Sequence, residues 1–290
     1  MVQVVEHTDG VAELRRPHQP GFFTGTRRSE QIEWIEDLLS RGGPIPDDAP
    51  AVCVLDTGVQ REHRLLTDAL DGADCHRADA QWRPDPVCPH GTEMAGPALY
   101  GDLESAPASF VGYEPIAPAG DLAPTSRTSA SFAHTGWPFK PDVVADGGNL
   151  LRSPDGGTVD RSDHLTVLTT RFHHLGTGSF LTGGFDASAA AATFAPAAAS
   201  VQAAYPALRP ETVRGLVVHS ARWTDAMHAH QSSRKRPPKG EPQVLRRRYG
   251  MGVPDLERAL RSASDALTLV CEGELHPQAR ASAECRPCLP

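Results

Sequence analysis

The residues Ala51-Val-Cys-Val-Leu55 run directly into Asp56-Thr-Gly58. Five apolar residues in succession, with β-branched valines among them, predict a buried strand of a parallel sheet. The proline-rich stretch Pro44–Pro50 before them and Gly58 after them mark the ends of this strand. Asp56 therefore follows the carboxyl end of a predicted strand, which is the edge where α/β sheets build their sites. The stretch predicts an α/β arrangement with a functional site that begins at Asp56.

Periodic and compositional signals elsewhere in the chain predict mostly helices. Ser29 is expected to cap a helix that ends near Arg41, where two glycines stop it. The alanine-rich residues 187–204 predict a helix kinked at Pro196, because alanine has the highest helix propensity. The other expected elements are strands at 142–145 and 165–170 and helices at 211–220 and 254–262.

The composition argues against several classes of protein. The 290 residues include 28 Lys and Arg against 36 Asp and Glu, which gives a formal net charge of -8. A general nucleic-acid binder needs a basic surface, so no nucleic-acid partner is expected. No run of about 18 apolar residues occurs, so no membrane partner is expected either. Residues 1–10 lack the pattern of a secretory signal, and the six cysteines are expected to be reduced thiols in a cytoplasmic protein.

Three short motifs place an aspartate, a histidine and a serine in that order along the chain. They are Val54–Val59 around Asp56, His90–Gly96 at the start of a helix of small residues, and Asp186–Ala190 around Ser188. Serine is a weak nucleophile unless a base removes its proton, and a carboxylate must hold that base in the right tautomer. A serine at a helix N-terminus gains further, because free N–H groups and the helix dipole favour developing negative charge.

The residues around these motifs resemble the subtilisin-like serine peptidase (subtilase) family. Asp56-Thr-Gly58 is similar to the aspartate motif of that family, with His63 soon after it, and His90–Gly96 is similar to its histidine motif. Three further blocks resemble the segment before the serine, the helix after the serine helix, and the closing turn, namely Lys140-Pro-Asp-Val143, residues 205–221 and residues 249–255. Five blocks in family order are specific as a set.

The resemblance implies a fold and a division into domains. The implied fold is a three-layer α/β domain around a mostly parallel sheet, incomplete in this chain. We expect the peptidase domain at residues 49–268, an N-terminal extension with one helix at 1–48, and an irregular tail at 269–290.

The resemblance also implies an activity, the hydrolysis of peptide bonds in peptide or protein substrates through an acyl-enzyme. By this resemblance Asp56 orients His90, His90 is the acid and base, and Ser188 is the nucleophile. Calcium is common in the family, but no loop here carries a recognisable calcium pattern. No metal and no cofactor is therefore expected.

The serine motif departs from the family pattern. Active members carry Gly-Thr-Ser with a proline four residues after the serine, whereas this chain has Asp186-Ala-Ser188 and Ala192. The aspartate puts a carboxylate two residues from the nucleophile, where it opposes formation of an oxyanion. The family's oxyanion-hole asparagine is also missing between His90 and Lys140, because the chain's single asparagine, Asn149, comes after that segment. Loss of one such donor typically lowers turnover by about 10²–10³.

The interval from His90 to Lys140 is only 50 residues, far shorter than in the family. Family-like sequence continues on both sides of Ser109 and Phe110, so we expect an internal deletion there. In the family the missing part supplies several strands and one wall of the substrate cleft. Two functions therefore stay open, an active endopeptidase and a catalytically inactive relative that binds peptides or other proteins.

Each site residue also has a simpler interpretation. Taken alone, Asp56 fits a turn, His90 fits a helix start and Ser188 fits a helix N-cap. Ser179 is a rival nucleophile, because it follows Gly176-Thr-Gly178 and so has the Gly-Thr that Ser188 lacks, although no helix start follows it.

The cysteines offer a third and weaker function, a metal-binding interaction module. Cys285 and Cys288 have zinc-knuckle spacing, and Cys75, Cys88 and His90 are candidates for the remaining ligands. One such pair without a second is a weak zinc signal.

Overall fold

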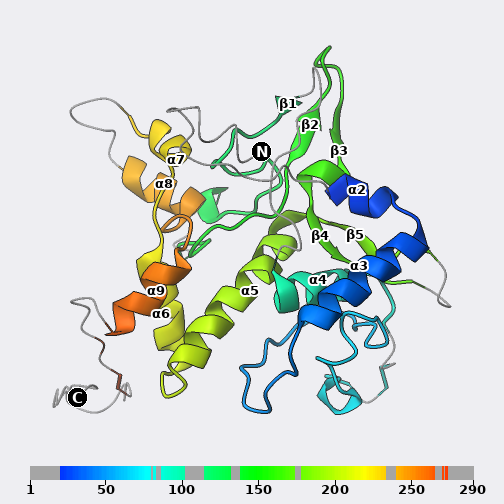
Figure 1. Ribbon diagram of the computed structural model, residues 1–290. Coiled ribbons are helices and arrows are strands. Elements are labelled where there is room, and N and C mark those ends of the chain that lie inside the picture. Colours follow the sequence, from blue (N-terminus) through cyan, green and yellow to red (C-terminus); the bar gives the residue numbers. More distant parts are fainter. Residues whose placement is uncertain are drawn as a thin grey trace, which may run out of the picture.

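Helices and short antiparallel strands make up the regular structure of the protein (Figure 1). The computed structural model describes residues 20–79, 81–82, 86–101, 114–131, 138–173, 178–232, 240–264, 270 and 272–273. The helices are α2 (Pro20–Gly25), α3 (Arg28–Arg41), α4 (His90–Tyr100), α5 (Asp186–Ala204), α6 (Pro210–Ser220), α7 (Asp225–Ala229), α8 (Glu241–Tyr249) and α9 (Leu256–Ser264). The strands are β1 (Glu114–Pro115), β2 (Leu150–Arg152), β3 (Val159–Arg161), β4 (Val167–Thr170) and β5 (Leu181–Gly184), with short 3-10 helices η1 (Gly72–Asp74) and η3 (Asp163–Leu165).

The part of the core that positions the site lies between α4, α5 and the β4–β5 hairpin (Figure 1). Met94 and Ala98 of α4 pack with Ala189 and Ala192 of α5 and with Val167 of β4. Small alanine side chains let the two helices approach closely, which explains why this stretch is so rich in alanine.

Gly96 sets how closely α4 lies against β4. A Cβ atom at this position would lie 2.7 Å from the Oγ1 atom of Thr169, so only glycine fits. Thr169 donates its hydroxyl to the Glu93 carbonyl, and Thr170 donates its hydroxyl to the Thr92 carbonyl. These two bonds tie the first turn of α4 to the strand.

The long helices predicted from the sequence are confirmed, with shifts of a few residues at their ends. They are α3, α5, α6 and α9, and Pro196 lies inside α5 as expected. The cap predicted for α3 is wrong. The helix begins at Arg28, and Arg27 occupies the N-cap position without a side-chain cap bond.

The described part of the N-terminal extension has two helices, α2 and α3, where the sequence predicted one, and α3 is part of the core. Ile35 of α3 is 2% exposed and packs with Leu65, Leu168, Phe180 and Leu181. This helix carries an apolar stripe that faces the rest of the molecule, made of Ile32, Ile35, Leu38 and Leu39.

The predicted strand at residues 51–55 is wrong. The segment is irregular, and its backbone makes no hydrogen bond to any residue that the structure describes. Leu55 is 92% exposed, and Val54 alone packs partly against the cluster between α4 and α5. A strand is stable only when a neighbour pairs with its N–H and C=O groups, and the described part of the chain places none beside this segment.

The sheets differ from the expected mostly parallel, three-layer arrangement. One sheet has the order β1-β2-β3 and the other pairs β4 with β5, and all these pairings are antiparallel. No parallel pair occurs among the residues described. Strand 165–170 is confirmed only from Val167 onward, and residues 142–145 form no strand. The N–H of Val144 instead bonds to the carbonyl of Gly252 in the turn near the C-terminal end.

The turn at residues 249–252 joins two of the segments that resemble the subtilase family, residues 140–143 and residues 249–255. Gly250 and Gly252 have positive φ angles of 56° and 100°. A Cβ atom on Gly250 would lie 2.3 Å from the Asp142 carbonyl oxygen, and one on Gly252 would lie 2.1 Å from that of Arg222. Both positions therefore require glycine, for its backbone angle and for its lack of a side chain.

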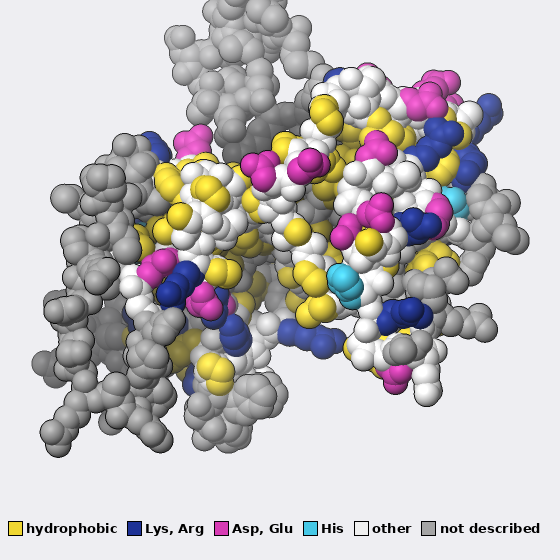
Figure 2. Space-filling model, turned by 90° about the horizontal axis from the view of Figure 1, so that it is seen from below, with side chains coloured by type: hydrophobic (Ala, Val, Ile, Leu, Met, Phe, Trp, Pro, Cys, Tyr) yellow, Lys and Arg dark blue, Asp and Glu magenta, His cyan; other side chains and the backbone are white. Residues whose placement is uncertain are grey.

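The surface mixes charged and apolar side chains. On the face shown in Figure 2, Asp and Glu side chains alternate with Lys, Arg and apolar side chains, and no broad basic field is visible. Among the described residues, no helix is both long and apolar enough to cross a membrane.

Candidate active site

Asp56 and His90, which are 34 positions apart, form a hydrogen-bonded pair. The Nδ1 atom of His90 lies 2.5 Å from Oδ2 of Asp56. Because a carboxylate accepts this bond, Nδ1 carries the proton of the neutral ring and Nε2 keeps its lone pair. The His90 side chain is 48% exposed, so the imidazole faces solvent rather than the core.

The other oxygen of Asp56 is held by its neighbour in the chain. Oδ1 accepts from the backbone N–H of Thr57 at 2.7 Å and from its hydroxyl at 3.2 Å. Partial burial opposes ionisation of Asp56, but the bonds from Thr57 and His90 outweigh it and keep the pKa of this carboxyl below its ordinary value. Asp56 is therefore an anion at neutral pH, as an orienting carboxylate must be.

Two glycines and a threonine bring the pair together. A Cβ atom on Gly91 would lie 2.2 Å from the carbonyl oxygen of Gly58, so α4 can begin here only with glycine after His90. The buried hydroxyl of Thr92 accepts from the N–H of Gln60 at 2.9 Å. The start of α4 is thus fixed against the loop that follows Asp56.

Ser188 lies in the first turn of α5, and it is exposed. Phe185 occupies the N-cap position without a side-chain cap bond, so the first N–H groups of this helix have no side-chain acceptor at the cap. α5 packs along α4, which carries His90. Within the described residues, no hydrogen bond joins Ser188 to His90.

Asp186 adopts a backbone conformation that favours glycine. Its φ angle is 75°, the only positive value at a non-glycine position in the described part of the chain. The turn at Gly147 packs directly on Asp186, because a Cβ atom on Gly147 would clash with the Asp186 carbonyl oxygen. The Oδ1 atom of Asp186 is buried and has no hydrogen-bond partner among the described residues.

The side-chain amide of Asn149 is hydrogen-bonded to the backbone. Its amide donates to the carbonyl of Ala117 at 2.8 Å, and its Oδ1 accepts from the N–H groups of Ala117 and Leu150. The chain's one asparagine therefore has a structural use.

Two charged residues near the site were not found from the sequence. Arg161 of β3 has its Nη2 atom 3.8 Å from Oδ2 of Asp186. Burial raises the pKa of Glu93 in the first turn of α4, against the opposing charges of His90, Arg171 and Arg161. No local pattern identifies Arg161, which meets the site only through the packing of β3, whereas Glu93 lies within the His90–Gly96 motif itself.

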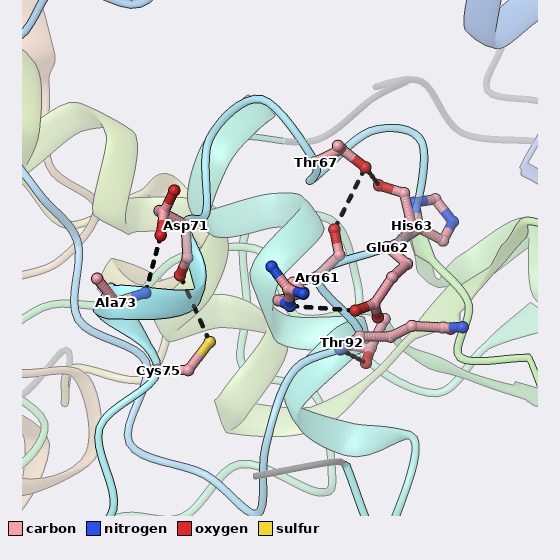
Figure 3. A network of polar contacts seen from close by, with 9 residues as sticks. Arg61, Glu62, His63, Thr67, Asp71, Ala73, Cys75 and Thr92 are labelled. Atoms are coloured by element: carbon pink, nitrogen blue, oxygen red, sulfur yellow. Dashed lines mark hydrogen bonds and ion pairs between the residues drawn. The ribbon is translucent and has the colours of Figure 1, made fainter.

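His63 has a structural role. It is fully buried, and its Nε2 donates to the carbonyl of Phe180 at 2.9 Å while Nδ1 accepts from the N–H of Leu65. Desolvation lowers the pKa of His63 to about 4. The surrounding loop is closed by its own polar contacts, among them the bonds of the Thr67 hydroxyl to the carbonyls of Arg61 and His63 (Figure 3).

Ser179, the rival nucleophile, and Cys88 make contacts that differ from those expected from the sequence. Ser179 donates to Oε1 of Gln31 at 2.9 Å and to the carbonyl of Leu181, so it links α3 to β5. The Sγ atom of Cys88 lies 2.8 Å from the hydroxyl of Thr57. Cys285 and Cys288 lie outside the described residues. Within those residues, no three His, Cys, Asp or Glu side chains are grouped as a metal site.

The comparison with known families gives a match in two parts. The subtilase family matches residues 47–115 and residues 108–252. The two matches meet at residues 108–115, which contain the position of the expected deletion. A search of curated proteins and a search of solved structures each gave no match. The two family matches together span most of the chain, and the protein is therefore a member of the subtilase family.

Proposed function

We propose that the protein is a serine endopeptidase that hydrolyses peptide bonds in peptides or proteins through an acyl-enzyme. Asp56 orients the imidazole, His90 takes the proton of the attacking hydroxyl and later returns it to the leaving amine, and Ser188 is the nucleophile. Membership of the subtilase family supports the reaction class.

One observation carries this proposal, the short bond between Nδ1 of His90 and Oδ2 of Asp56. It selects the tautomer in which Nε2 is the base, which is the state that a serine nucleophile requires. A histidine that only began a helix would have no need of a carboxylate partner on a separate loop.

A second candidate function is a binding module without catalysis. The use of Asn149 favours it, because the amide that an oxyanion hole would need is bound to Ala117. Asp186, two residues before the nucleophile, favours it too. In this case the same surface binds a peptide but does not cleave it.

Labelling with a fluorophosphonate probe distinguishes the two. This reagent phosphonylates only a serine whose hydroxyl is activated. The active enzyme is labelled, Ser188→Ala abolishes the labelling, and Ser200→Ala leaves it unchanged because that exposed serine lies on the same helix and bonds only to the carbonyl of Pro196. A folded wild-type protein that takes up no label contradicts the peptidase and favours the binding module.

A further inference from the structure

The negative charge of Asp186 lies where an attacking Ser188 needs a positive potential. Asp186 is the first residue of α5 and Ser188 the third. A carboxylate at this end of a helix already interacts with the N-terminal dipole, so it weakens the field that would favour a second negative charge there. Its Oδ1 atom is buried without a partner in the described part of the chain, so hydrogen bonds do not disperse that half of the carboxylate.

Arg161 faces the other half of this carboxylate. The Nη2 atom of Arg161 lies 3.8 Å from Oδ2 of Asp186, and this is the one ion pair that Asp186 makes among the described residues. The guanidinium also lies over the ring of Phe185, with Cζ 4.2 Å from the ring centroid. Phe185 is buried at the N-cap of α5, so the stacking holds the cation beside the first turn.

We propose that Arg161 neutralises Asp186 and so keeps the first turn of α5 able to stabilise negative charge on the side chain at position 188. The inference rests on the proposed role of Ser188 as nucleophile. Arg161 is then a positioning residue that acts through Asp186. It compensates for the departure from glycine that this chain carries in its serine motif.

A thiol at position 188 measures this effect without any turnover. In a Ser188→Cys variant of the full chain, the rate of alkylation by iodoacetamide at pH 7 follows the fraction of thiolate, which is a negative charge at the site. Mass spectrometry of the peptide that contains position 188 separates this thiol from the six native cysteines. Iodoacetamide is uncharged, so its own approach does not depend on Arg161.

We expect a specific pattern of rates in the Ser188→Cys background. Arg161→Met slows alkylation about threefold, and Asp186→Asn speeds it about threefold, in line with a partly exposed ion pair. When Asp186→Asn is already present, Arg161→Met changes the rate by less than about 1.5-fold, because the charge that Arg161 offsets is gone. Asparagine tolerates the positive φ angle, so this variant keeps the turn.

Two controls exclude simpler explanations. Arg152→Met removes the same charge from the neighbouring strand β2 and leaves the rate unchanged. Arg161→Lys keeps the charge and preserves most of the rate, which a purely structural role of the guanidinium stack would not predict. Circular dichroism of each variant confirms that it is folded.

Two results overturn the inference. One is an Arg161→Met variant that reacts as fast as its parent, and the other is an equal slowing with and without Asp186→Asn, which would mean that Arg161 acts on position 188 directly. Fluorophosphonate labelling of the wild type separately decides the peptidase. If the thiol rates follow the expected pattern but the wild type takes up no fluorophosphonate, the role of Arg161 stands and only the peptidase activity is refuted.

Discussion

At the scale of single residues, the site depends on how Asp56 is held. Thr57 fixes one oxygen of its carboxylate and His90 binds the other. The side-chain amide of asparagine cannot replace a carboxylate in this role. Its nitrogen presents a donor where Nδ1–H of His90 needs an acceptor, or it leaves the ring in the wrong tautomer.

Asp56→Asn is therefore expected to lower the rate of fluorophosphonate labelling by at least about 100-fold, while the protein stays folded. The rate is measured by quenching the labelling reaction at successive times and reading the fluorescence of the labelled protein on a gel. Asp146→Asn is a suitable control, because Asp146 accepts only from the N–H of Gly148. An Asp56→Asn variant that keeps the wild-type rate would show that His90 does not work through this carboxylate.

The strained backbone at Asp186 gives a stability prediction. A left-handed conformation costs an L-residue roughly 1–2 kcal/mol, and glycine avoids that cost, although its freedom in the unfolded chain offsets part of the gain. Asp186→Gly is expected to raise the free energy of unfolding by about 1 kcal/mol, measured by urea titration. Asp160→Gly, in the extended strand β3, is expected to give no gain. Equal effects at the two positions would contradict strain at Asp186.

Buried His63 makes stability depend on pH. In the folded protein the pKa of His63 is lowered from 6.5 to about 4, so the ring is neutral over a range in which an unfolded histidine is protonated. The unfolded chain therefore binds more protons between these two values, and stability that is complete above pH 6.5 falls as the pH drops towards 4. The total loss is roughly 3 kcal/mol.

Urea titrations at pH 7.5, 6 and 5 measure this loss. His63→Gln flattens the dependence on pH, even if it lowers stability at every pH by disturbing the core. His219→Gln, at an exposed position of α6, leaves the dependence as it is. If the wild type were equally stable at the three pH values, His63 would not be held neutral by its burial.

At the scale of elements, the sequence predicts the helices better than the strands. The stripe of α3 and the alanine run of α5 carry their signal locally, so both are recovered. The segment 51–55 has the residues of a buried strand, yet a strand also needs a partner that local sequence cannot supply. In the same way, order along the chain led to the Asp56–His90 pair, whereas Arg161 comes to the site only through packing.

The packing of α3 makes the N-terminal extension necessary for stability. Ile35 is buried against Phe180 and Leu181, and its truncation leaves a cavity in that cluster. Ile35→Ala is expected to lower the free energy of unfolding by about 2–4 kcal/mol. Ile45→Ala makes the same change at a position that is 49% exposed, and it is expected to cost far less. Equal and small losses would mean that the extension is a separate unit.

At the scale of the whole molecule, the subtilase family matches the chain in two parts, residues 47–115 and residues 108–252. The two family matches meet at residues 108–115, and this supports the deletion expected near Ser109 and Phe110. The backbone at residues 51–55 pairs with no strand in the described part of the chain, and this agrees with a sheet that has lost part of its strands. Sequencing of the coding region and its transcript tests the deletion, because a longer form of the gene would restore the missing interval.

The central claim is that Asp56 and His90 activate Ser188 for cleavage of peptide bonds. The most direct measurement is incubation of the purified protein with a diverse pool of peptides, followed by mass spectrometry of the new chain ends. We expect cleavage products with the wild type and none with Ser188→Ala. A folded wild-type protein that leaves the pool intact, or a Ser188→Ala variant that cleaves as the wild type does, would contradict it.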